Sequence, residues 1–128
     1  MAKIMIIGDK EVDLKFLKII LQNQDHEVFT DYCYEKATEQ IEEIMPEIVI
    51  IDVESDPTNA FELCKKIRSE NKFHHIQVMF FCDTNDTDIT ETGFETGASD
   101  YISKPINEDE IKNRIDHRLE VIKTHKKA

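Results

Sequence analysis

The chain has 128 residues, 40% of them hydrophobic, which predicts a single domain with one core. Its formal net charge of −11 argues against binding to nucleic acid or to an anionic membrane, because both attract clustered Lys and Arg. No apolar stretch approaches the roughly 18–20 residues that cross a bilayer, and the first residues do not resemble a secretion signal. We therefore expect a cytoplasmic protein whose partners are other proteins.

Strands and helices alternate along the sequence. Short apolar runs predict strands over residues 3–7, 27–30, 48–51, 78–81 and 100–102. Apolar residues at helical spacing predict a helix near Asp13, helices over residues 34–44 and 60–69, and a last helix from Asn107. Residues 83–97 are rich in Thr and contain Gly, so a helix there is expected to be marginal. The alternation implies a parallel sheet with helices on both faces.

The cysteine count argues against two structural roles. Cys33, Cys64 and Cys82 form no CxxC pair and leave an odd count, which argues against a disulfide framework or a zinc site. Cys64 is interpreted as a buried, reduced thiol.

Three charged residues stand at the ends of predicted strands. Asp52 directly follows a run of four β-forming residues, Asp9 follows the first strand, and Lys104 follows the fifth. Because the carboxyl ends of parallel strands meet at one edge, these side chains are expected to converge there. Two carboxylates and an ammonium together suggest a site for a divalent metal and a phosphoryl group.

Specific motifs surround these charges. They are Gly8-Asp9 after the first strand, Asp52 after its apolar run, and GASDYISKP at residues 97–105. The chain closely resembles the receiver domain of two-component response regulators, whose GAxDYxxKP signature the last motif matches. The spacing agrees, since Cys82 stands thirty residues after Asp52, where receivers usually carry Thr or Ser, and Lys104 follows twenty-two later.

The resemblance covers residues 3 to about 122 and implies a fold. We expect a flavodoxin-like (βα)5 doubly wound sheet of five parallel strands in the order 2-1-3-4-5. Residues 1–122 would form the receiver domain, and residues 123–128 a polar extension or the start of a linker. The last helix is similar to helices that lead into output domains, so a stand-alone receiver and part of a longer protein both stay open.

The resemblance also implies a function. A histidine kinase or phosphotransfer protein would pass a phosphoryl group to Asp52 with Mg²⁺ bound. Asp9, Asp52 and the backbone carbonyl of Glu54 would hold the metal, and Lys104 would pair with the phosphoryl oxygens. Pro105 would form a cis Lys-Pro bond that helps to aim the lysine. Such a domain is not expected to be an enzyme beyond self-catalysed phosphoryl transfer and autodephosphorylation.

Output would follow the face formed by the fourth helix, fifth strand and fifth helix. Tyr101 matches the family's switch aromatic on this face, and a half-buried strand tyrosine is the structural alternative. The face would contact an output domain or a protein partner. A homodimer is also left open, as are the identities of the kinase and the downstream partner.

Four departures from the family pattern fall at the same edge. Gly8 replaces the first of two acids, which is expected to weaken Mg²⁺ binding by ~10–100-fold. Cys82 places a weak hydrogen-bond donor at the switch position, unless it is simply a core thiol. Asp83 replaces a small residue and would either repel a phosphoryl group or partly replace the missing acid. The loop over residues 54–60 lacks the usual MPxxDG.

Two functions therefore compete. One is a phosphoacceptor that exchanges a phosphoryl group slowly or conditionally. The other is a pseudo-receiver, a protein-interaction module that works without phosphorylation. A cofactor-binding enzyme of similar fold is disfavoured, because the sequence has no GxGxxG motif and no phosphate-binding glycine loop.

Overall fold

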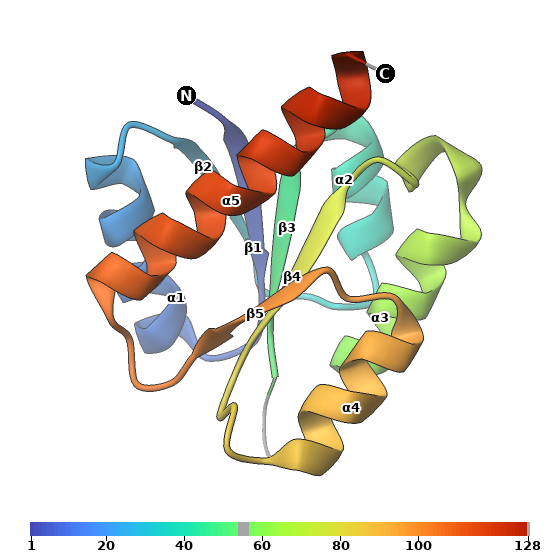
Figure 1. The fold of residues 1–128 in the computed structure, drawn as a ribbon. Coiled ribbons are helices and arrows are strands. Elements are labelled where there is room, and N and C mark those ends of the chain that lie inside the picture. Colours follow the sequence, from blue (N-terminus) through green and yellow to red (C-terminus); the bar gives the residue numbers. More distant parts are fainter. Residues whose placement is uncertain (54–56, 128) are drawn as a thin grey trace.

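The computed structural model describes residues 1–53 and 57–127 and contains one parallel sheet in the order β2-β1-β3-β4-β5. The strands are β1 (Lys3–Ile7), β2 (Glu27–Asp31), β3 (Ile48–Asp52), β4 (Gln77–Cys82) and β5 (Asp100–Ser103). The helices are α1 (Glu11–Asn23), α2 (Ala37–Ile44), α3 (Thr58–Ser69), a 3₁₀ turn (Asn71–Phe73), α4 (Thr87–Thr96) and α5 (Glu108–Lys127). Helices α1 and α5 cover one face of the sheet, and α2, α3 and α4 cover the other (Figure 1). The expected fold class is confirmed.

Strand β3 separates two apolar layers. Its residues Val49 and Ile51 pack toward α2 and α3, whereas Ile48 and Ile50 pack toward α1 and α5. All four side chains are fully buried, which explains a continuous apolar run rather than an alternating one. The first charge after this run stands where the strand ends, so the sequence of β3 positions Asp52 at the carboxyl edge of the sheet.

Helix α2 starts later than expected. It begins at Ala37 rather than Tyr34, because side chains hold the preceding residues in a turn. The Asp31 carboxylate accepts the N–H of Cys33 at 2.9 Å, and the Tyr34 hydroxyl donates to the main-chain carbonyl of Asp52 at 2.7 Å. This turn ties the end of β2 to the end of β3.

Helix α4 forms with both ends capped. The Asp86 carboxylate accepts the N–H of Ile89 at 3.2 Å, and Gly97 ends the helix in the left-handed region with a φ of 111°. Helix α5 continues through Lys127 without a break at residue 122. None of the described helices is long and apolar enough to span a membrane.

Candidate functional site

Asp52 and Lys104 meet at the carboxyl edge of the sheet. The Asp52 side chain is fully buried, and its Oδ1 lies 2.5 Å from Nζ of Lys104. Lys104 follows β5 and precedes a cis peptide bond to Pro105, as the resemblance implied. Its ammonium also lies 3.5 Å from the carbonyl oxygen of Val53 and 5.0 Å from the centre of the Phe81 ring. A buried carboxylate is tolerated when it is paired, and Lys104 supplies a cation for Asp52 here.

A second carboxylate, Asp13, was missed as a site residue. Asp13 lies in the first turn of α1, and its Oδ2 is 3.9 Å from Nζ of Lys104. The lysine is therefore placed between a buried acid and a partly exposed one. The sequence offered one signal for this, an acid in the first turn of a helix that starts at the site edge, but that position also suits a helix start.

Gly8 lies directly against Asp52. Strands β1 and β3 are neighbours, with Ile7 paired to Ile51. A β-carbon built at Gly8 would lie 2.7 Å from Cβ of Asp52, closer than real side chains approach. The strand ends are thus packed together where most receivers carry an acid.

The metal expectation rests on two described carboxylates. Asp9 follows β1 and is exposed, and Asp52 ends β3. Their oxygens suit a hard divalent cation. The backbone carbonyl of Glu54 lies outside the described residues. Among the described side chains, those of residues 1–53 and 57–124, no three His, Cys, Asp or Glu residues gather closely enough to hold a metal by themselves.

The switch position carries a neutral thiol. Cys82 is buried at the end of β4, and burial raises the pKa of its thiol to about 12 although Lys104 acts in the opposite direction. The thiol therefore stays protonated near neutral pH and can offer only a weak S–H donor. The backbone of Cys82 is well held, since its carbonyl accepts the N–H of Lys104 at 2.8 Å.

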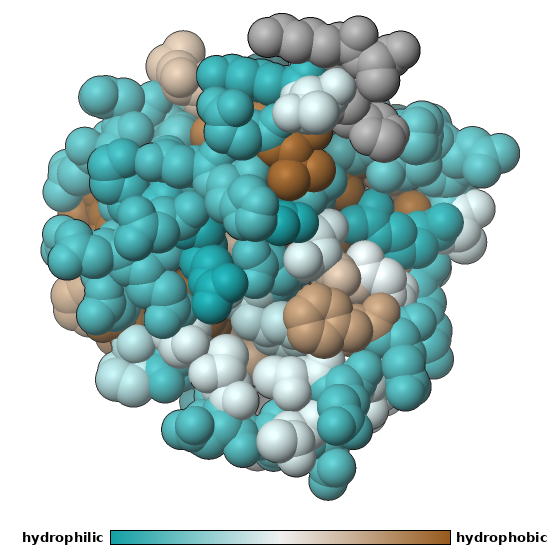
Figure 2. All heavy atoms as spheres, viewed as in Figure 1, coloured by the Kyte–Doolittle hydropathy of each residue, from teal (hydrophilic) through white to brown (hydrophobic). Residues whose placement is uncertain are grey.

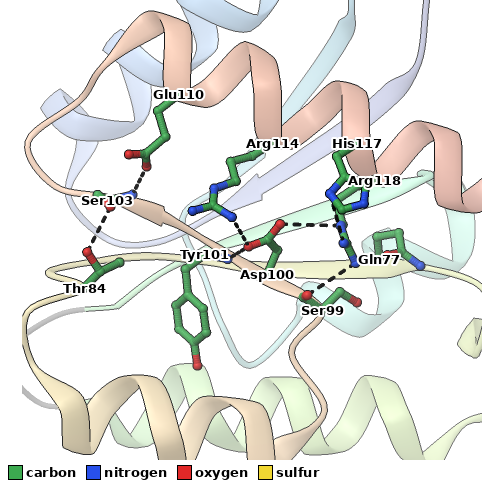
Figure 3. Close-up of polar contacts among 10 residues, drawn as sticks. All are labelled: Gln77, Thr84, Ser99, Asp100, Tyr101, Ser103, Glu110, Arg114, His117 and Arg118. Atoms are coloured by element: carbon green, nitrogen blue, oxygen red, sulfur yellow. Dashed lines mark hydrogen bonds and ion pairs between the residues drawn. The ribbon is translucent and has the colours of Figure 1, made fainter.

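Asp83 stabilises a turn. Its side chain is exposed, and its carboxylate accepts the N–H of Asn85 at 3.0 Å. The next residue, Thr84, shares a hydrogen bond of 2.9 Å with the Ser103 hydroxyl, while Glu110 accepts the Ser103 N–H at 2.7 Å (Figure 3). These contacts join the loop after β4 to the start of α5.

Tyr101 and Asp100 point to opposite sides of β5. Asp100 pairs with Arg114 at 3.2 Å and Arg118 at 3.5 Å, which fastens β5 to α5. Figure 3 shows the Tyr101 ring directed away from this network, toward α4. Tyr101 is 6% exposed, and its hydroxyl donates to the carbonyl of Thr90. Burial raises the pKa of this hydroxyl, which stays protonated and remains a donor.

Comparison with known proteins identifies the family of the chain. The sequence-family model of the response regulator receiver domain matches residues 4–116 of the chain. Protein RcaC of Microchaete diplosiphon is 28% identical over 121 residues, which are 94% of this chain and 19% of that protein. Regulatory protein VanR of Enterococcus faecium is 29% identical over 118 residues, 91% of this chain and 49% of that protein. The chain thus spans half or less of these relatives.

Solved structures show the same fold. The chemotaxis response regulator CheY4 of Vibrio cholerae superimposes with a TM-score of 0.83 at 19% identity, covering 92% of this chain and 98% of that one. A two-component response regulator from Clostridium difficile gives 0.82 at 21% identity, covering 94% and 97%. With the family match over most of its length, the chain belongs to the response regulator receiver domains of two-component systems.

Proposed function

We propose that Asp52 accepts a phosphoryl group from a phosphohistidine and that this changes the face formed by α4, β5 and α5. The observation that carries the proposal is the buried Asp52–Lys104 pair at the carboxyl edge of the sheet. Receiver domains as a family work with histidine kinases and output domains, so the donor would be a histidine kinase or phosphotransfer protein. In this role the chain is a phosphoacceptor and not an enzyme with a separate substrate.

The transfer is a displacement at phosphorus. A carboxylate oxygen of Asp52 forms the new P–O bond while the P–N bond to the donor imidazole breaks, and the imidazole leaves with that electron pair and takes up a proton. Lys104 moves from the carboxylate to the phosphoryl oxygens, where its point charge stabilises negative charge. Hydrolysis of the resulting acyl phosphate by water would return the carboxylate.

Mg²⁺ would assist at the same edge. Asp9 and Asp52 supply carboxylate oxygens, and the bound ion would neutralise charge on the transferring group. Asp13 and Asp83 add negative charge near the entrance and hinder a phosphoryl donor until this cation is present. With glycine at position 8, Mg²⁺ binding would be weaker than in receivers with two acids.

The donor would dock on α1. Val12, Phe16 and Ile19 lie at helical spacing and are 66%, 58% and 54% exposed, which is unusual for large apolar residues. Beside them lies a groove of about 410 Å³ lined by Asp13, Phe16, Ile20, Phe81, Lys104, Pro105, Ile106 and Glu108. Phe16 of this apolar stripe therefore lines the same groove as Lys104. A helix of the donor packed on this stripe would deliver its phosphohistidine to Asp52.

Output would use the face formed by α4, β5 and α5, and not the α1 surface on which the donor docks. Figure 2 views the side of α4 and α5 and shows a mainly hydrophilic surface with small hydrophobic areas. Such a surface suits a partner or a second copy that binds reversibly, since transient interfaces resemble ordinary protein surface in polarity. We place this signalling in the cytoplasm, where kinases that draw on ATP supply the phosphoryl group.

Phosphorylation of Asp52 can be tested without a kinase. The protein is incubated with Mg²⁺ and acetyl phosphate, or titrated with beryllofluoride, and compared with Asp52→Ala. We expect modification and analogue binding by the wild type and neither by the variant. Absence of both in the wild type at saturating Mg²⁺ would refute the phosphoacceptor role, and equal modification of both proteins would refute the assignment of Asp52.

Phosphorylation-independent protein binding is the second candidate. It is favoured by the buried, protonated thiol at position 82 and by the missing acid at position 8. If the chain is a pseudo-receiver, the wild type and Asp52→Asn should bind the partner with the same affinity, with or without acetyl phosphate. A phosphoacceptor would bind with an affinity that depends on both.

A further inference from the structure

Gly93 leaves a gap in α4 that another residue could not leave. It is buried in the middle of the helix, where glycine is the poorest helix former after proline. A β-carbon built at this position would overlap the Tyr101 hydroxyl and would lie 2.7 and 2.8 Å from two atoms of the Phe80 ring. Packing and not helix formation therefore explains glycine at position 93.

Tyr101 fills this gap. Its hydroxyl donates to the carbonyl of Thr90, one helical turn before Phe94. Its ring meets Phe80 at 5.8 Å and Phe94 at 4.6 Å between centroids, with interplanar angles of 75° and 74°. Both are edge-to-face contacts, which are favourable for aromatic pairs. The ring is thus held on two sides and at its tip.

We propose that Gly93 forms a notch in α4 that receives the Tyr101 hydroxyl and holds this side chain inward before Asp52 is modified. The notch biases the α4–β5–α5 face toward one conformation in the resting protein. The link between the notch and modification of Asp52 rests on the proposed function. The notch itself is a property of the unmodified chain.

The backbone of α4 supplies the polar contact of the Tyr101 hydroxyl. A hydroxyl there could hold a polar group firmly, whereas the Cys82 thiol cannot. In this chain the Tyr101 hydroxyl is satisfied by the α4 backbone instead. The hydrogen bond that holds Tyr101 inward therefore does not come from the side chain at the switch position.

Substitution of Gly93 separates packing from helix propensity, because the two predict opposite signs. Propensity alone predicts that Gly93→Ala raises the thermal midpoint of unfolding. The notch predicts a lower midpoint and displacement of the Tyr101 ring. The matched control is Thr92→Ala, an exposed neighbour in the same helix, which should not lower the midpoint.

Ring displacement is read by ¹⁹F NMR of protein labelled with 3-fluorotyrosine, with the Tyr101 signal assigned by Tyr101→Phe. All spectra are recorded without Mg²⁺ or a phosphoryl donor, so a failure of Asp52 phosphorylation leaves this test intact. We expect the Tyr101 signal to shift in Gly93→Ala and to stay in place in Thr92→Ala. An unshifted signal with a raised midpoint in Gly93→Ala would overturn the notch.

A double variant covers the case in which Gly93→Ala does not fold. Tyr101→Phe removes the hydroxyl that the added methyl group would meet and keeps the ring. We expect Gly93→Ala to lower the midpoint less in the Tyr101→Phe background, or to fold only there. Equal loss in both backgrounds would overturn the proposal, because the clash would then not involve the Tyr101 hydroxyl.

Discussion

Gly8 and Asp52 approach so closely that a β-carbon at position 8 would lie 2.7 Å from Cβ of Asp52. The contact follows from the pairing of β1 with β3, which brings the last residues of both strands side by side. Glycine at position 8 therefore leaves no empty space in the site, because Asp52 already packs where a side chain at position 8 would begin. Restoring an acid there would require the strand ends to separate.

Gly8→Ala is expected to destabilise the protein by about 1–3 kcal/mol, the usual effect of adding a methyl group to a filled site. The measurement is urea unfolding in Mg²⁺-free buffer. Asp9→Ala is the control, because Asp9 is exposed and its loss should change stability by no more than about 0.5 kcal/mol. Equal stability of wild type and Gly8→Ala would show that the strand ends have room.

Lys104→Gln should destabilise the fold strongly, by roughly 3–5 kcal/mol, because it leaves the buried Asp52 carboxylate without its cation. Asp52→Asn in the same chain should recover most of this loss, since it removes the uncompensated charge. The control is Lys112→Gln, whose pair with Asp116 at 2.7 Å is exposed and should contribute at most about 0.5 kcal/mol. Similar losses for Lys104→Gln and Lys112→Gln in chemical denaturation would contradict the burial argument.

Phe16→Ala should slow transfer from a phosphohistidine donor and leave modification by acetyl phosphate unchanged. A buried interface aromatic typically contributes 1–2 kcal/mol or more, which predicts at least a roughly 5–30-fold rise in KM for the donor. Met45→Ala removes an exposed apolar side chain at the end of α2 and serves as the control. If Phe16→Ala impairs both phosphoryl sources equally, the residue acts on the fold or the site and not on docking.

The three thiols should differ sharply in reactivity. Cys33 is exposed, whereas Cys64 and Cys82 are buried, and burial raises the pKa of both buried thiols. At about pH 8, a pKa of about 12 leaves roughly one Cys82 side chain in ten thousand as thiolate. Brief alkylation of the native protein should label Cys33 alone, and denatured protein should be labelled three times. Fast labelling of Cys82 would contradict its protonated, buried state.

His26 should make stability depend on pH. Burial and the positive N-terminus lower its pKa from 6.5, while Asp116, Asp25 and Glu47 act in the opposite direction, and its Nδ1 accepts the N–H of Ala2. The unfolded chain then binds a proton more readily than the folded one. Stability should fall as pH drops through 6.5 and level off below the lowered folded pKa.

The measurement for His26 is the difference in unfolding free energy between wild type and His26→Gln. Glutamine keeps a side-chain acceptor and does not titrate, so carboxylates elsewhere cancel in the difference. We expect the unfolding free energy of the wild type to fall relative to that of His26→Gln as the pH is lowered from about 7.5 to about 5. A difference that is constant with pH would show that His26 titrates alike in both states.

The sheet and the main site pair could be predicted because the signals were local. Apolar runs bounded by charges gave the strands, and parallel strands bring their carboxyl ends together, which placed Asp52 and Lys104 at one edge. The pairing of Lys104 with Asp13 depends on how α1 lies over the sheet, which no local pattern encodes. The late start of α2 likewise depends on the long-range hydrogen bond from Tyr34 to Asp52.

Helix α4 shows why propensity alone was insufficient. Thr and Gly predicted a marginal helix, and the residue that weakens it most, Gly93, is the one that admits Tyr101. The residues that pack against Gly93 are Phe80 of β4 and Tyr101 of β5, so these contacts form only once the sheet is assembled. High mobility of α4 in the unmodified protein stays a prediction, which amide hydrogen exchange over residues 86–95 can measure.

Borohydride reduction tests most directly whether Asp52 carries the phosphoryl group. Wild-type protein treated with Mg²⁺ and acetyl phosphate is reduced, digested and mapped by mass spectrometry, with Asp52→Asn as the control. Hydride converts an acyl phosphate to an alcohol and releases phosphate, so we expect homoserine at position 52 of the wild type only. Homoserine at Asp9, Asp13 or Asp83, or none at any position with saturating Mg²⁺, would contradict the account.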